Sequence, residues 1–113
     1  MSKAKRLFCI IEEDMVRMFF ETVLGDAGWE VYALGTIEDA SFRIPEFDPD
    51  ILIFDTALVA PQRDEIASWK TGRARKIGLG FIGEKELWGS EIDAFLEKPL
   101  EPLTLSDKIL SLL

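Results

Sequence analysis

Short apolar runs alternate along the chain with stretches in which apolar residues recur at helical spacing. Residues 7–11 and 51–54 are apolar without alternation, which is typical of strands buried on both faces. Between them, apolar residues recur at i, i+3, i+4, i+7 and i+8 from Val16 onward. This spacing predicts an amphipathic helix that ends at Gly28. Residues 29–34 then predict a second strand.

The rest of the chain continues this alternation of strands and helices. Thr36-Ile37-Glu38-Asp39 is typical of a capped helix start, and Pro45 is expected to help end that helix. We expect further elements at residues 64–70 (helix), 77–82 (strand with internal glycines), 84–88 (one helical turn), 93–97 (strand), and a last helix opened by Pro102. The order is therefore five strand–helix units in which the fourth helix is short or missing.

Five such units predict an α/β fold with a parallel sheet covered on both faces. The expected architecture is a three-layer flavodoxin-like sandwich with strand order 2-1-3-4-5, in one domain over residues 1–113. In that order, the carboxyl ends of the first, third and fifth strands meet at one edge of the sheet. Those ends carry Glu12 with Glu13, then Asp55, then Lys98.

Composition narrows the chemistry that this edge can perform. The net charge of −8 repels nucleic acid phosphates and anionic lipid, so we expect neither as a partner. The chain has no histidine and a single cysteine, Cys9, which excludes an internal disulfide and leaves carboxylates, amines and hydroxyls as reactive groups. The apolar run after the basic N-terminus is too short for a signal peptide. We therefore expect a cytoplasmic protein.

Carboxylates that crowd at a strand edge repel one another and need a cation. With oxygen ligands only, that cation would be Mg²⁺ or a similar hard ion. Lys98 supplies a second positive charge, which could pair with Asp55 or with a phosphoryl group attached to it. A carboxylate can also attack phosphorus as a nucleophile.

These residues give the chain an end-to-end resemblance to the CheY-like receiver domains of two-component response regulators. Ile51-Leu52-Ile53-Phe54-Asp55 looks like the strand that carries the phospho-acceptor, and Phe95-Leu96-Glu97-Lys98-Pro99 looks like the fifth strand and its lysine. The resemblance implies that Asp55 accepts a phosphoryl group, that Lys98 pairs with it, and that Mg²⁺ binds beside them. It also implies that Phe95 is an aromatic switch residue and that the peptide bond before Pro99 is cis.

The acidic residues depart from the family's pattern. Arg17 and Phe19-Phe20 fit the family's first helix without a gap if Glu12 takes the place of the metal-binding acid, which puts Ile11 at the partner acid's position. A shift by one residue instead makes Glu12 and Glu13 the metal-binding pair. In either register Glu replaces Asp, and its extra methylene moves the carboxylate by about 1.5 Å. Acids here could also simply favour the dipole of the helix that follows.

The fourth strand departs from the family as well. The hydroxyl residue that ends this strand in receivers would fall at Ile82 or Gly83, and neither has a hydroxyl. The segment after it is shorter than the family norm. Some receivers with a short fourth helix carry a Phe-Ala-Thr-Gly signature, which Gly80-Phe81-Ile82-Gly83 echoes only distantly.

Three functions remain open on this sequence. The first is a receiver that takes a phosphoryl group onto Asp55 from a histidine kinase or histidine phosphotransfer protein and signals by binding another protein, without being an enzyme for a separate substrate. The second is a pseudo-receiver, an interaction module independent of phosphorylation. The third, a flavodoxin-like nucleotide or flavin binder, is disfavoured because the loop after the first strand is acidic and lacks Gly, Ser and Thr. The shortened fourth helix leaves room for a homodimer interface.

Overall fold

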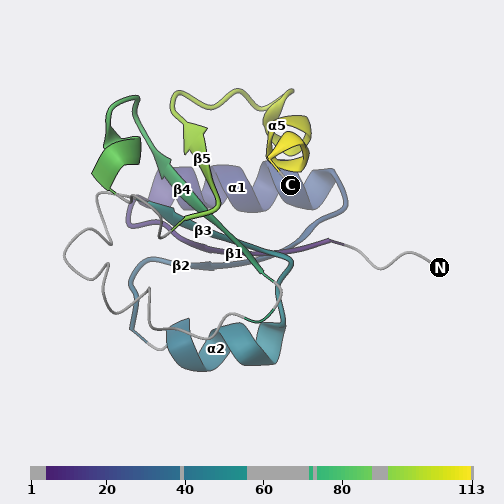
Figure 1. The fold of residues 1–113 in the computed structure, drawn as a ribbon. Helices are drawn as coiled ribbons and strands as arrows, with labels where there is room; N and C mark the ends of the chain where they lie inside the picture. The colour runs from purple at the N-terminus through teal and green to yellow at the C-terminus, as the bar shows by residue number, and fades with distance from the viewer. Residues whose placement is uncertain (1–4, 39, 56–71, 73, 88–91, 113) are drawn as a thin grey trace.

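Five parallel strands form the centre of the molecule, in the order β2-β1-β3-β4-β5 (Figure 1). The computed structural model describes residues 5–38, 40–55, 72, 74–87 and 92–112. The strands are β1 (Arg6–Ile10), β2 (Glu30–Leu34), β3 (Ile51–Asp55), β4 (Arg75–Gly80) and β5 (Ala94–Glu97). The helices are α1 (Asp14–Asp26), α2 (Ala40–Phe47), the 3₁₀ turn η2 (Glu84–Leu87) and α5 (Leu105–Ser111). The predicted strand order and the reduction of the fourth helix are confirmed.

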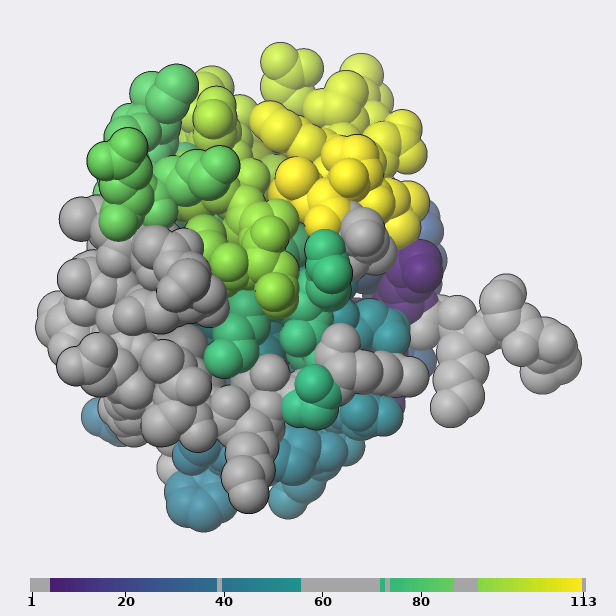
Figure 2. All heavy atoms as spheres, in the orientation of Figure 1, coloured from purple at the N-terminus to yellow at the C-terminus, as the bar shows by residue number. Residues whose placement is uncertain are grey.

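Helices α1 and α5 cover one face of the sheet, and α2 covers the other (Figure 1). The side chains of β1 and β3 alternate between these layers. Leu7, Cys9, Ile51 and Ile53 pack in the cluster with α1 and α5, while Phe8, Ile10, Leu52 and Phe54 pack in the cluster with α2. All eight side chains are fully buried, which explains why these strands are apolar throughout instead of alternating with polar residues. Figure 2 shows the same two layers as surfaces, with α5 at the top and α2 at the bottom of this face.

The prediction that Pro45 ends the second helix is wrong. Pro45 lies inside α2, which begins at Ala40 and continues to Phe47. The Asp48 N–H still donates to the Ile44 carbonyl at 2.9 Å. Proline removes its own N–H from the helix and crowds the carbonyl four residues earlier, but the buried side chains of Ala40 and Ile44 hold the segment against the sheet.

Two further boundaries differ from the sequence prediction. The fourth strand is two residues earlier than expected at each end, so Ile82 lies outside it and is 81% exposed. Glycines are tolerated in β4 because it pairs with β3 on one side and β5 on the other. The last helix begins at Leu105 and not at Pro102, because the chain first makes a turn in which the Thr104 N–H donates to the Glu101 carbonyl at 3.3 Å.

Some predictions fall outside the described residues. These are the helix at residues 64–70 and Asp39 in the expected helix cap. Where the structure does describe a helix, that helix is too short or too polar to span a bilayer.

Candidate functional site

Asp55 is the last residue of β3 and lies at the carboxyl edge of the sheet. In the described part of the chain it is the one buried polar or charged residue, with 5% of its surface exposed. Alternation along β3 directs it to the same layer as Ile51 and Ile53, beneath α1 and α5. A carboxylate with so little exposure requires compensating partners.

Lys98 is one such partner. Its Nζ lies 3.3 Å from Asp55 Oδ2, and the exposed fractions of the two side chains are 18% and 6%. The Lys98 N–H also donates to the Gly80 carbonyl at 2.8 Å, so the start of the β5–α5 loop is tied to the end of β4. The Lys98–Pro99 peptide bond is cis, as the resemblance implied. Folding therefore brings the predicted acceptor and the predicted lysine into contact.

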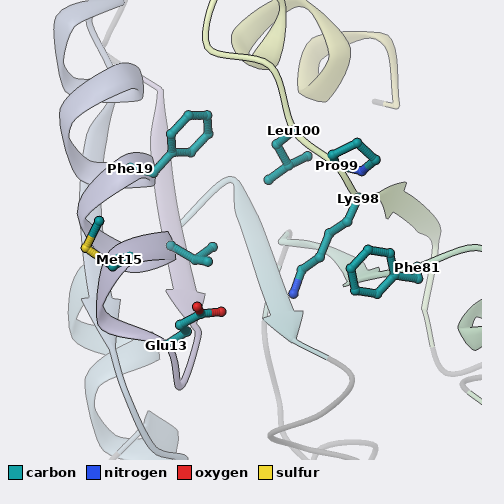
Figure 3. Close-up of a pocket in the computed structure, with 8 residues that line it drawn as sticks. Glu13, Met15, Phe19, Phe81, Lys98, Pro99 and Leu100 are labelled. Atoms are coloured by element: carbon teal, nitrogen blue, oxygen red, sulfur yellow. The ribbon is translucent and has the colours of Figure 1, made fainter.

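Glu12 and Glu13 follow β1 and are both exposed. Glu13 occupies the N-cap position of α1, but its side chain makes no capping hydrogen bond. Its carboxylate instead points into a pocket whose opposite side holds the Lys98 ammonium (Figure 3). Glu13 therefore caps α1 through no side-chain hydrogen bond, and its placement suits a role at this edge of the sheet.

Ile11 is fully buried in the cluster on the α1 and α5 side. Ile10 is paired with Phe54, so the next residues along, Ile11 and Asp55, come to the same level of two neighbouring strands. Ile11 therefore occupies a position beside Asp55 that a second acid could have taken. It fills this position with a hydrocarbon side chain. The acids that follow Ile11 in the chain are Glu12 and Glu13.

Arg17 fixes the loop between β1 and α1. Its Nη1 donates to the Ile11 carbonyl at 2.7 Å and to the Glu12 carbonyl at 2.8 Å, and its Nη2 pairs with the Asp14 carboxylate. Gly35 makes room for this guanidinium, since a Cβ there would lie 2.7 Å from Arg17 Nη1. Sequence reasoning used Arg17 only to set a register and gave no signal of this clamp.

The oxygen donors here suit Mg²⁺ only if water completes the shell. Among the described residues, no three His, Cys, Asp or Glu side chains gather as a metal site. Mg²⁺ commonly binds through one or two carboxylates and keeps several waters. Asp55 and the two glutamates after β1 supply carboxylate oxygens of the kind that Mg²⁺ binds, so the chemistry of these donors fits the ion in a partly hydrated form.

Phe81 is a site residue that sequence reasoning missed. It follows β4 directly, and its ring centroid lies 5.5 Å from Lys98 Nζ. The predicted positions for the missing hydroxyl lie one and two residues further on. Ile82 is 81% exposed, and Gly83 has a φ of 98° in the turn before η2. The two-residue error in the end of β4 is the reason that Phe81 was overlooked.

A pocket of about 400 Å³ opens beside the Asp55–Lys98 pair. Its walls come from the start of α1, the end of β4 and the β5–α5 loop, and are formed by Glu13, Met15, Val16, Phe19, Phe81, Lys98, Pro99 and Leu100 (Figure 3). Most of these side chains are apolar, while Glu13 and Lys98 bring opposite charges to it. The pocket lies in the same layer as Asp55.

Two other predicted residues lie away from these contacts. Phe95 on β5 is half-buried and packs against the cluster on the α2 side. Cys9 is fully buried in β1, and burial raises the pKa of its thiol to about 12. Cys9 is thus a core residue, as expected for a thiol on a central strand.

Comparison with known proteins identifies the fold but not a close relative. No family model matches the sequence, and no curated protein matches it. Among solved structures, the chemotaxis response regulator CheY4 of Vibrio cholerae aligns with a TM-score of 0.80 at 17% identity, over 98% of this chain and 100% of that one. A protein provisionally named a response regulator, from Chloroflexus aurantiacus, aligns at 0.81 and 25% identity, over 97% and 98%.

The chain has the fold of a response regulator receiver domain. A third neighbour with this receiver fold is the receiver domain of a sensor histidine kinase from Pseudomonas aeruginosa, with a TM-score of 0.78 and 17% identity over 96% of this chain and 97% of that one. That structure is described with a magnesium ion coordinated in the active site cleft. The alignments cover nearly the whole chain, so the receiver fold accounts for all of the described elements.

Proposed function

We propose that this protein is a receiver that accepts a phosphoryl group on Asp55 and transmits the change by binding another protein. One observation carries the proposal: in a receiver fold, Asp55 Oδ2 at the end of β3 lies 3.3 Å from Lys98 Nζ at the end of β5. The phosphoryl donor would be a histidine kinase or a histidine phosphotransfer protein. We expect the protein to act in the cytoplasm and to catalyse no reaction of a separate substrate.

In the proposed reaction, an Asp55 carboxylate oxygen attacks the phosphorus of a phosphohistidine in line with the P–N bond. The new O–P bond forms as the P–N bond breaks, and the departing imidazole nitrogen takes a proton from water. Lys98 already lies beside the attacking carboxylate and can pair with the added negative charge on the phosphoryl oxygens. When bound, Mg²⁺ would supply charge neutralisation, held by Asp55 and by Glu12 or Glu13.

The change in charge gives the protein its signal. Phosphorylation replaces the single negative charge of the Asp55 carboxylate with up to two on the phosphoryl oxygens, a net gain of about one negative charge beside Lys98 and the acidic loop after β1. Lys98 joins the end of β4 through its backbone and borders the pocket through its side chain. A shift in Lys98 therefore changes the surface formed by the β4 end and the β5–α5 loop, where a partner can detect it.

The test is a titration with Mg²⁺ and beryllofluoride, a phosphoryl mimic, followed by fluorine NMR. The parent protein is expected to give a bound fluorine signal that saturates, and Asp55→Asn is expected to abolish it. Glu12→Gln and Glu13→Gln make the same chemical change at neighbouring positions, so they can be compared directly for Mg²⁺-dependent binding. The variant that loses Mg²⁺-dependent binding identifies the metal-binding acid. Failure of the parent to bind at millimolar concentrations would refute phosphorylation of Asp55.

A pseudo-receiver is the alternative favoured by one observation. The fully buried Ile11 stands where a second acid could assist the metal. In that case the protein binds its partner with equal affinity with and without beryllofluoride, and Asp55→Asn leaves partner binding unchanged. The same titration, repeated with a partner recovered by affinity purification, separates the two functions.

A further inference from the structure

We infer that Phe81 is a positioning residue that holds the Lys98 ammonium beside Asp55 through the face of its aromatic ring. The contact between Phe81 and Lys98 is present in the protein without a phosphoryl group. Its effect on phosphoryl binding rests on the function proposed above. No hydroxyl is needed for this role, because the ring acts on the cation and not on the phosphoryl oxygens.

The geometry places Lys98 Nζ between two attractive groups. Asp55 Oδ2 lies 3.3 Å from Nζ, and the centroid of the Phe81 ring lies 5.5 Å from it. A cation within about 6 Å of a ring centroid is attracted by the negative face of the ring. Only 18% of the Lys98 side chain is exposed, so water screens this attraction less than at an open surface. The long, flexible lysine stem is thereby restrained at its charged end.

Hydrogen bonds hold the backbone on both sides of Phe81, which fixes the position of its ring. The Phe81 N–H donates to Glu84 Oε1 at 2.6 Å, and the Glu84 N–H donates back to the Phe81 carbonyl at 3.0 Å. The Lys98 N–H donates to the carbonyl of Gly80, the residue before Phe81, at 2.8 Å. The two side chains that meet are thus attached to backbone segments that are hydrogen-bonded together, which limits how far the ring can move from the ammonium.

Core packing does not account for Phe81. Its side chain is 57% exposed, and exposure of an aromatic ring brings no gain in hydrophobic free energy. Phe81 lines the pocket together with Lys98 and Leu100 (Figure 3). A contact with the ammonium gives this ring a function that burial does not.

The first experiment measures the contact directly by NMR of the Lys98 side-chain methylene protons, assigned by their loss in Lys98→Met. The ring current of Phe81 is expected to shift these protons upfield in the parent protein. Phe81→Leu keeps an apolar side chain but should remove the shift, whereas Phe81→Tyr should retain it. Phe42→Leu is the matched control, because Phe42 is also exposed, at 73%, but lies on α2. Unshifted Lys98 protons in the parent would overturn the inference.

The second experiment measures the consequence for beryllofluoride binding in the presence of Mg²⁺. Because Phe81 itself is 57% exposed, we assign the contact the lower range of cation–π energies, about 0.5–1 kcal/mol, which corresponds to about a two- to fivefold change in affinity. Phe81→Leu is expected to bind beryllofluoride two- to fivefold more weakly, with Phe81→Tyr and Phe42→Leu close to the parent. Equal affinity in Phe81→Leu would contradict the positioning role. If the parent binds no beryllofluoride, the proposed function fails while the NMR shifts still decide the contact. Thermal melts of each variant confirm that it is folded.

Discussion

The contact between Asp55 and Lys98 makes a sharp stability prediction. Lys98→Met removes the ammonium but keeps an unbranched apolar side chain of similar length. At 3.3 Å, the gross attraction of the two charges is about 5 kcal/mol at an effective dielectric constant of about 20. Desolvation of both charges offsets part of this attraction, so the net value of the pair is smaller. The loss of one partner, however, leaves the other charge buried without its ion pair.

The expected cost follows from burial. Removing one partner of a buried ion pair typically costs about 3–5 kcal/mol. Asp55 is 5% exposed, but the Lys98 side chain retains 18% exposure, which lets water replace part of the lost contact. We therefore expect Lys98→Met to lower the free energy of unfolding by about 3 kcal/mol at pH 7. Asp55 keeps its other interactions in this variant, which also keeps the loss near the lower limit.

Urea unfolding of a double-mutant cycle isolates the pair. In the Asp55→Asn background, residue 55 carries no carboxylate that could lose its ion pair. Lys98→Met should therefore lower the free energy of unfolding by about 1–3 kcal/mol less than it does in the parent. The remaining contacts of both residues are common to the compared proteins and cancel. The reasoning fails if Lys98→Met costs the same in both backgrounds, or less than about 1 kcal/mol in the parent.

Three further predictions concern the residues that support the site and the core. Burial raises the pKa of Cys9 to about 12 from its ordinary value of 9.0, so the folded protein keeps a proton that the unfolded chain loses. Stability should fall by about 1.4 kcal/mol per pH unit from about pH 9 toward pH 12, and urea melts should show a smaller slope in Cys9→Ala. Gly35→Ala should destabilise the protein by about 0.5–1.5 kcal/mol, because a Cβ 2.7 Å from Arg17 Nη1 displaces the guanidinium and weakens its hydrogen bonds to the Ile11 and Glu12 carbonyls. The same change should be nearly neutral in an Arg17→Ala background, and additivity would contradict the proposed clash. Ser106→Ala should cost about 1–2 kcal/mol in thermal or urea melts, because the buried Trp29 Nε1–H donates to Ser106 Oγ at 2.9 Å; an unchanged midpoint would show that water replaces the hydroxyl.

Local errors in the sequence prediction share one cause. Pro45 has a strong intrinsic preference against the interior of a helix, and it was given too much weight. In the protein, buried neighbours hold Pro45 inside α2. Conversely, Ile82 was assigned to a strand because it is apolar, yet it is exposed in a turn. Propensity is a weak prior that packing overrides.

The order of elements, the parallel sheet and the residues at its carboxyl edge were determined by the sequence alone. Short unbroken apolar runs bounded by polar residues are typical of strands buried on both faces, and the polar residues that end such strands meet where parallel strands end together. Asp55 and Lys98 could be named for this reason.

Only the tertiary structure decided which side chains face one another across that edge. The contact of Phe81 with Lys98 joins segments that are distant in the chain. The clamp of Arg17 on the Ile11 and Glu12 carbonyls and the inward placement of Glu13 depend on where a strand ends to within one residue. A one-residue shift reverses the side of the sheet to which a side chain points, and the pattern of apolar residues does not fix strand ends that closely.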